Sequence, residues 1–144
     1  MKFPREPLFD SKPEKRLTLY AINSDISNCK FSVLIRKKAM DNYDEITRLA
    51  PIKQETKISN FLNKGITQFI QDNVISSSIS FKVGSYIGRE IVYSQLNYST
   101  GKWYMQFTKF LFAKNNIYII QCSIYTEGEC DNEKKSFLNS ISQN

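Results

Sequence analysis

The 144-residue chain contains no histidine, and this absence narrows its chemistry at once. Without histidine there is no histidine acid–base catalysis, no histidine metal ligand and no Ser-His-Asp triad. Only five glycines and four prolines are present, which excludes a collagen-like or linker-like chain. No run of 18 apolar residues occurs, so we expect no membrane-spanning helix.

Cysteine is also scarce, with Cys29, Cys122 and Cys130 alone. They form no CxxC pair and no metal-binding spacing, so we predict no metal site and no cofactor. The odd number argues against a disulfide framework but leaves open one bonded pair with one free thiol. Cys122 lies in an apolar run, which is typical of a core residue. Cys130 lies among acidic residues, which raise the pKa of a thiol and make it a poor nucleophile.

The composition that remains is that of one globular domain. Hydrophobic residues make up 41% of the chain and aromatic residues 13%. Pro4, Pro7 and Pro13 discourage regular structure near the start. We therefore predict an extended N-terminal arm over residues 1–16, outside the core, and a single α+β domain over residues 17–144.

Apolar periodicity predicts the elements of this domain. An apolar stripe of helical spacing runs from Ile58 to Asn73, and Gly65 at its centre is expected to let the helix sit close to a sheet. A second helix is expected over residues 132–142. For residues 41–49 the sequence is compatible with either a short helix or an irregular edge. Alternating or β-prone runs predict strands at 17–21, 29–35, 74–83, 89–97, 103–112 and 117–126.

Short turns between the later strands indicate an antiparallel meander. Gly84 to Gly88 is expected to form a tight connection, and Lys114-Asn115-Asn116 is a hairpin signal. The predicted fold class is thus α+β, an antiparallel β-sheet flanked by helices. We expect six large side chains in its core, and Phe69→Ala to cost about 3–5 kcal/mol; the six are Phe61, Phe69, Phe81, Phe107, Ile119 and Phe137.

The strand from Trp103 to Phe112 is strongly aromatic and resembles a nucleic-acid stacking platform. Its alternation, however, places apolar side chains on both faces. This pattern is typical of a central strand covered by helices on both sides, which leaves no exposed platform. We therefore disfavour nucleic acid as a partner.

The net charge of +6 is concentrated at the start of the chain. Residues 1–38 carry nine basic and four acidic side chains, whereas the other residues carry eleven and ten. This excess favours an acidic partner or a membrane surface. We take Arg36, Lys37 and Lys38 as candidate partner contacts. Arg89 and Glu90 are two further candidates; they lie on opposite faces of a strand and are expected to pair with neighbouring strands rather than with each other.

Three local patterns carry a family resemblance. They are Gly84-Ser85-Tyr86-Ile87-Gly88-Arg89-Glu90, the hairpin ending Lys114-Asn115-Asn116-Ile117-Tyr118, and the closing Lys135-Ser136-Phe137-Leu138-Asn139-Ser140. Over residues 17–142 the chain resembles the superfamily of the PsbP extrinsic photosystem proteins and the Ran-binding Mog proteins, and most of all its small bacterial members of unknown role. The resemblance implies an α-β-α sandwich, no shared enzymatic activity, and function through binding of other proteins.

Two functions follow as hypotheses. The first is a non-enzymatic protein-interaction or accessory domain with a protein partner. The alternative is a small-molecule or lipid carrier with an apolar pocket between sheet and helix. An enzyme is not expected, because no catalytic motif accompanies the missing histidine. Met1-Lys2 is followed by no apolar stretch, so we expect either a cytoplasmic location or the bacterial cell envelope after removal of a leader.

Overall fold

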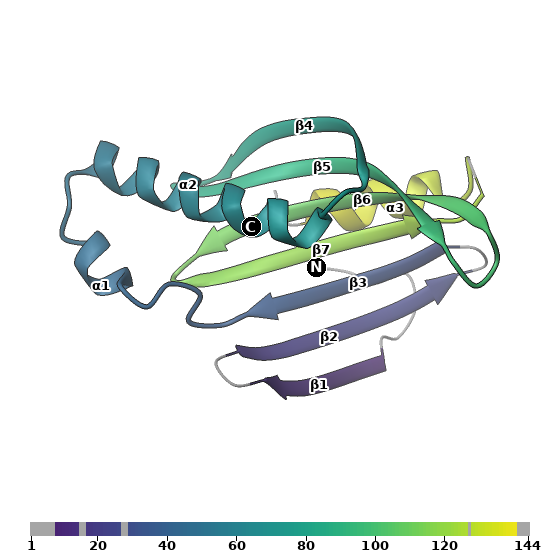
Figure 1. Ribbon diagram of the computed structural model, residues 1–144, viewed down its shortest axis with the longest axis horizontal. Helices are drawn as coiled ribbons and strands as arrows, with labels where there is room; N and C mark the ends of the chain where they lie inside the picture. The colour runs from purple at the N-terminus through teal and green to yellow at the C-terminus, as the bar shows by residue number, and fades with distance from the viewer. Residues whose placement is uncertain (1–7, 15–16, 27–28, 127, 141–144) are drawn as a thin grey trace.

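In the computed structural model, one antiparallel sheet carries a long helix on one face and a short helix on the other (Figure 1). The structure describes residues 8–14, 17–26, 29–126 and 128–140, with side chains described from Cys29 onward. The strand order is β1-β2-β3-β7-β6-β5-β4. The strands are β1 (Leu8–Glu14), β2 (Leu17–Ile26), β3 (Cys29–Arg36), β4 (Val74–Val83), β5 (Tyr86–Asn97), β6 (Lys102–Ala113) and β7 (Asn116–Ile124).

The helices are α1 (Tyr43–Ile46), α2 (Pro51–Ile70) and α3 (Asp131–Asn139). The predicted α+β class and the antiparallel sheet are confirmed. Helix α2 begins seven residues before the expected Ile58, because Pro51 occupies the first turn, where its missing N–H has no cost. Within the described part of the chain, no helix combines the length and apolar character needed to cross a bilayer.

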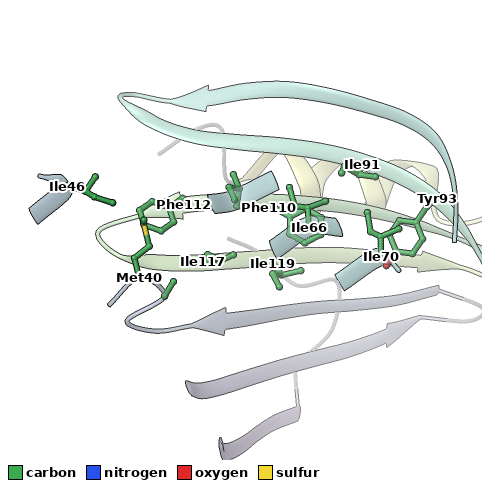
Figure 2. Packing of buried hydrophobic residues seen from close by; sticks show 12 residues of the cluster. Met40, Ile46, Ile66, Ile70, Ile91, Tyr93, Phe110, Phe112, Ile117 and Ile119 are labelled. Atoms are coloured by element: carbon green, nitrogen blue, oxygen red, sulfur yellow. The ribbon is translucent and has the colours of Figure 1, made fainter. Parts of the chain in front are cut away.

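Each face of the sheet carries its own hydrophobic cluster. Beneath α2, Leu62, Ile66 and Ile70 of the helix pack on Phe110 and Phe112 of β6 and on their neighbours (Figure 2). Beneath α3, the second cluster gathers residues of β3, β6, β7 and the helix, with a perpendicular ring pair formed by Phe31 and Phe137. The central strands β6 and β7 are therefore covered on both faces over part of their length.

The predicted core is confirmed in part. Ile119 and Phe137 are buried, whereas Phe61, Phe81 and Phe107 are only partly buried. The prediction for Phe69 is wrong, since 38% of its surface is exposed and its ring packs edge-on against Phe110 at the margin of α2. The loss of about 3–5 kcal/mol predicted for Phe69→Ala is typical of a fully buried ring, so it does not apply to this partly exposed one.

Two glycines have roles different from those predicted. Gly84 has a φ of 60° and forms the turn between β4 and β5 with Ser85, as expected. Gly88 is not a turn residue, because it lies within β5, where the Phe81 ring occupies the space of a Cβ. Gly65 does not bring α2 close to the sheet, since a Cβ there would meet no atom within 4 Å.

The N-terminal arm differs from its predicted form. Residues 8–14 form the edge strand β1, which pairs with β2 in seven register positions. Pro13 is compatible with this place, because a residue without an N–H is tolerated in an edge strand. The domain boundary at residue 17 stays a prediction, and residues 1–7, 15 and 16 lie outside the described residues.

The predicted hairpin at Lys114-Asn115-Asn116 is confirmed. Lys114 and Asn115 have φ angles of 49° and 59° and form a two-residue turn between β6 and β7. The Asn115 side chain also accepts a hydrogen bond from the Met40 N–H at 2.8 Å and donates one to the Met40 carbonyl at 3.1 Å. This turn therefore holds the segment that leads from β3 toward the helices.

Candidate functional site

A large hollow lies where β6 begins and β7 ends, beside the start of α3. We call it the aromatic cleft. It has a volume of about 580 Å³, and its lining residues Trp103 and Tyr104 directly follow the hairpin that joins β5 to β6. The residues that line it are Trp103, Tyr104, Met105, Phe107, Ile124, Tyr125, Gly128, Asp131 and Lys134.

Aromatic side chains of this cleft are exposed to an unusual degree. Trp103 is 61% exposed and Tyr125 is 44% exposed, and Tyr98 in the adjoining turn is 91% exposed. The rings of Tyr104 and Tyr125 stack with their centres 4.8 Å apart. Trp103 also borders a smaller hollow, whose other lining residues are Gln71, Asp72, Asn73, Val74, Leu96 and Tyr98. Exposed aromatic side chains therefore continue from the cleft through Trp103 to Tyr98 at the end of the β5–β6 hairpin, beside a hollow of mixed polar and apolar lining.

One cation belongs to the wall of the aromatic cleft. The Lys134 Nζ lies 4.0 Å from the centre of the Phe107 ring and 3.7 Å from an Asp131 carboxylate oxygen. The ring and the carboxylate together fix the ammonium group on α3. The cleft thus offers aromatic faces together with one ammonium group and one carboxylate.

The sequence interpretation missed Trp103, because it took the whole aromatic strand as covered. The strand β6 has 12 residues and is about 40 Å long. The helix α3 has nine residues and is about 14 Å long. A helix of that length covers only part of the strand, so Trp103 at the beginning of β6 extends beyond it. The mismatch of predicted lengths was the signal that could have revealed the exposed end.

A second hollow lies between α2 and the sheet, and we call it the helix cavity. Its volume is about 220 Å³. Figure 2 labels four of its lining residues, Ile66, Phe110, Ile117 and Ile119, between the helix and strands β6 and β7. The full lining is Leu34, Arg36, Leu62, Gly65, Ile66, Phe69, Phe110, Ile117 and Ile119.

The basic triplet predicted as a partner contact divides between the surface and this cavity. Lys37 and Lys38 are exposed after the end of β3. Arg36 is the last residue of β3 and lines the helix cavity. Its Nε is inaccessible to solvent and has no hydrogen-bond partner. A buried N–H without a partner is uncommon in a folded protein and marks Arg36 for closer attention.

Arg89 and Glu90 lie on β5, which β7 and β6 separate from Arg36. As predicted, each pairs with a neighbouring strand. The Arg89 guanidinium donates to the Ser78 hydroxyl at 2.8 Å, and Glu90 lies 3.8 Å from the Nζ of its cross-strand partner Lys109. The five predicted contact residues therefore do not form one cluster, and their contact with a partner protein stays a prediction.

The cysteines form one pair and one free thiol, which is one of the alternatives left open by the sequence. Cys29 of β3 is bonded to Cys130, the residue before α3. Glu129 lies close to both sulfur atoms, and these three side chains are the one potential metal-ligating group found among the described residues. The disulfide occupies both sulfurs, so neither is available as a thiolate ligand. Burial raises the pKa of the free Cys122 thiol to about 12, although the charge of Lys134 acts in the opposite direction.

A buried polar network lies on the α2 face, beyond the apolar cluster. The Gln121 amide donates to the Tyr93 hydroxyl and to the Thr108 hydroxyl, each at 2.9 Å. Burial raises the pKa of Tyr93, although both neighbours act in the opposite direction. Beside them, the Ser123 hydroxyl donates to Gln106 at 2.6 Å. Because these side chains satisfy one another, the network explains how polar residues stay buried in the sheet.

Comparison with known proteins informs the fold but not the chemistry. No protein-family model and no curated protein matches this sequence. Among solved structures, the chain is similar to PA94, a protein of unknown function from Pseudomonas aeruginosa. The TM-score is 0.54 at 8% sequence identity, and the match covers 94% of this chain and 95% of PA94. A likeness at this identity shows a shared fold alone.

Proposed function

We propose that this protein is a non-enzymatic interaction domain that contacts a protein partner through the aromatic cleft. The observation that carries the proposal is the exposure of Trp103 and Tyr125 in the aromatic cleft, with the exposed Tyr98 in the adjoining turn. A single exposed apolar side chain is ordinary, but several that gather at one place mark an interaction surface. Tryptophan and tyrosine also dominate the binding energy of protein interfaces.

The sequence patterns and the order of elements together indicate a superfamily. We infer membership of the PsbP- and Mog-like superfamily from the three sequence patterns, and the order of elements supports it. Three strands precede a long helix, and a four-strand meander leads to the final helix. Because the resemblance implies function through protein binding, it agrees with an interaction surface on this chain.

The test compares protein capture by the intact chain and by Trp103→Ala. Trp103 is largely exposed, so its removal leaves the melting temperature close to that of the intact chain. The control is Ile52→Ala, which removes an 81% exposed side chain from the start of α2, away from the cleft. The intact chain and the two variants are each used as bait in extract of the native cells, and the retained proteins are quantified by mass spectrometry.

We expect at least one protein that the intact chain and Ile52→Ala retain equally and that Trp103→Ala loses by about tenfold or more, as for a hot-spot residue. If every protein retained by the intact chain is retained equally by Trp103→Ala, the aromatic cleft is not the contact surface.

A second function, the carrier, has one observation in its favour. The helix cavity lies between sheet and helix, where a carrier would hold an apolar ligand. Its volume of about 220 Å³ is below the range of about 300–1,000 Å³ that is usual for drug-sized ligands. A carrier of this form would therefore serve a small ligand.

A further inference from the structure

We propose that the helix cavity binds a medium-chain aliphatic carboxylate, with the carboxylate held by Arg36. This inference rests on the second function, the carrier, and is independent of the aromatic cleft. It assigns a ligand class from three features of the cavity: its apolar wall, its one cationic group and its glycine.

The wall of the cavity selects an aliphatic chain. Among the nine described lining residues, Arg36 is the only one that carries charge, and the others are Gly65 and seven aliphatic or aromatic residues. An apolar wall of this kind favours apolar molecules. A water-sized group takes about 30 Å³, so the cavity has room for about seven such groups. This size suits a chain of about six to eight carbon atoms.

Arg36 selects the acid group of the ligand. Arg36 lines a cavity that is otherwise apolar, and its Nε is enclosed by protein atoms and has no hydrogen-bond partner. A guanidinium group presents parallel N–H donors that match the two oxygens of a carboxylate. A bound carboxylate would therefore neutralise the one charge in the wall. A neutral ligand such as an alcohol would leave that charge unpaired.

Gly65 keeps the cavity open from the helix side. Leu62, Gly65, Ile66 and Phe69 follow one another at helical spacing along the lining face of α2. At Gly65 an added Cβ would meet no atom within 4 Å, so the missing side chain leaves space rather than close packing. Glycine inside a helix is unfavourable relative to alanine, and an open cavity is a physical reason for its presence here.

The experiment measures binding of octanoate and of 1-octanol by calorimetry to the full chain and to four variants. Arg36→Gln removes the proposed partner, and Lys38→Gln removes an exposed charge two residues away as its control. Gly65→Leu fills the cavity, and Gly65→Ala is its control. Amide NMR shifts of the intact chain locate the bound ligand without any substitution.

We expect octanoate to bind at least about tenfold more tightly than octanol, as a charge-assisted hydrogen bond implies. Arg36→Gln should remove this difference, Lys38→Gln should retain it, and Gly65→Leu should lose both ligands. The octanoate shifts should centre on Leu62, Ile66 and Phe110.

Other results overturn the proposal in distinguishable ways. Equal binding of the two ligands, or unchanged octanoate binding by Arg36→Gln, refutes the carboxylate contact and leaves the carrier function standing. If the intact chain binds neither ligand, or if the shifts centre on the aromatic cleft, the ligand site and the carrier function are both refuted. The interaction function is unaffected by each of these outcomes.

Discussion

At the scale of single residues, two glycines should respond in opposite ways to the same substitution. Gly88→Ala places a methyl group where the Phe81 ring lies, so we expect a loss of about 1–3 kcal/mol from overpacking. Gly65→Ala places the methyl group in open space within α2, so we expect a gain of up to about 1 kcal/mol. Urea titration of the three proteins measures both changes in the free energy of unfolding.

The pair serves as its own control, because the chemical change is identical. Equal effects of the two substitutions would contradict the different packing described for β5 and α2. A stable Gly88→Ala would show that the Phe81 ring moves aside without loss.

A second residue-scale prediction concerns pH and the free thiol. Because burial raises the pKa of Cys122 to about 12 in the folded protein, against an ordinary value of 9.0, folding favours the neutral thiol. The resulting stability is complete below about pH 8.5 and is lost as the pH rises toward 12. Cys122→Ala lacks this group, so the difference in unfolding free energy between the intact chain and Cys122→Ala should shrink from pH 8 to pH 11. A constant difference would show that the thiol is not buried.

At the scale of elements, one buried lysine of the sheet stabilises the position of α3 through a hydrogen bond. The Lys109 Nζ donates to the Leu138 carbonyl at 2.9 Å, near the end of α3 where helix carbonyls lack partners. Lys109→Met should cost about 1.5–3 kcal/mol, the usual effect of losing a hydrogen bond to a charged group. Hydrogen exchange should show the loss of protection first in α3. The exposed Lys102 of the same strand provides the control, and Lys102→Met should change neither quantity.

Most elements could be predicted from the sequence, because the spacing of their apolar residues indicates which face is buried. The stripe of α2, the hairpin at Asn115 and the antiparallel sheet are of this kind. Quantities that depend on how far one element extends over another could not be predicted. Phe69 and Trp103 fit buried patterns but lie at the margins of the helices that cover the sheet. An apolar pocket between sheet and helix was part of the carrier hypothesis, but the side chains that open it could not be predicted, since Gly65 is compatible with close contact or with open space.

At the scale of the whole molecule, the sheet joins two separate parts of the chain. The N-terminal strands β1 to β3 and the later meander β4 to β7 meet where β3 pairs with β7. The disulfide between Cys29 and Cys130 spans 101 positions of sequence and connects the same two parts a second time. Disulfides persist in oxidising compartments, so the choice between the two predicted locations depends on whether this bond forms in the cell.

This disulfide should raise the melting temperature of the molecule. Closure of a loop of about 100 residues is worth up to about 4.7 kcal/mol in the chain-entropy description, and 2–4 kcal/mol is typical. For a chain of this size, each 1 kcal/mol corresponds to about 2–4 °C, so reduction should lower the melting temperature by about 5–15 °C. Calorimetry with and without a reductant measures the change.

The two cysteine variants make this prediction specific. Cys130→Ala should melt at the lower temperature in both conditions, because the bond is already absent. Cys122→Ala should keep its sensitivity to reductant, because Cys122 is not part of the bond. Unfolded but unreduced protein should expose one titratable thiol, from Cys122. Three thiols in protein purified under oxidising conditions would refute the bond, and with it the argument that β3 and α3 are covalently joined.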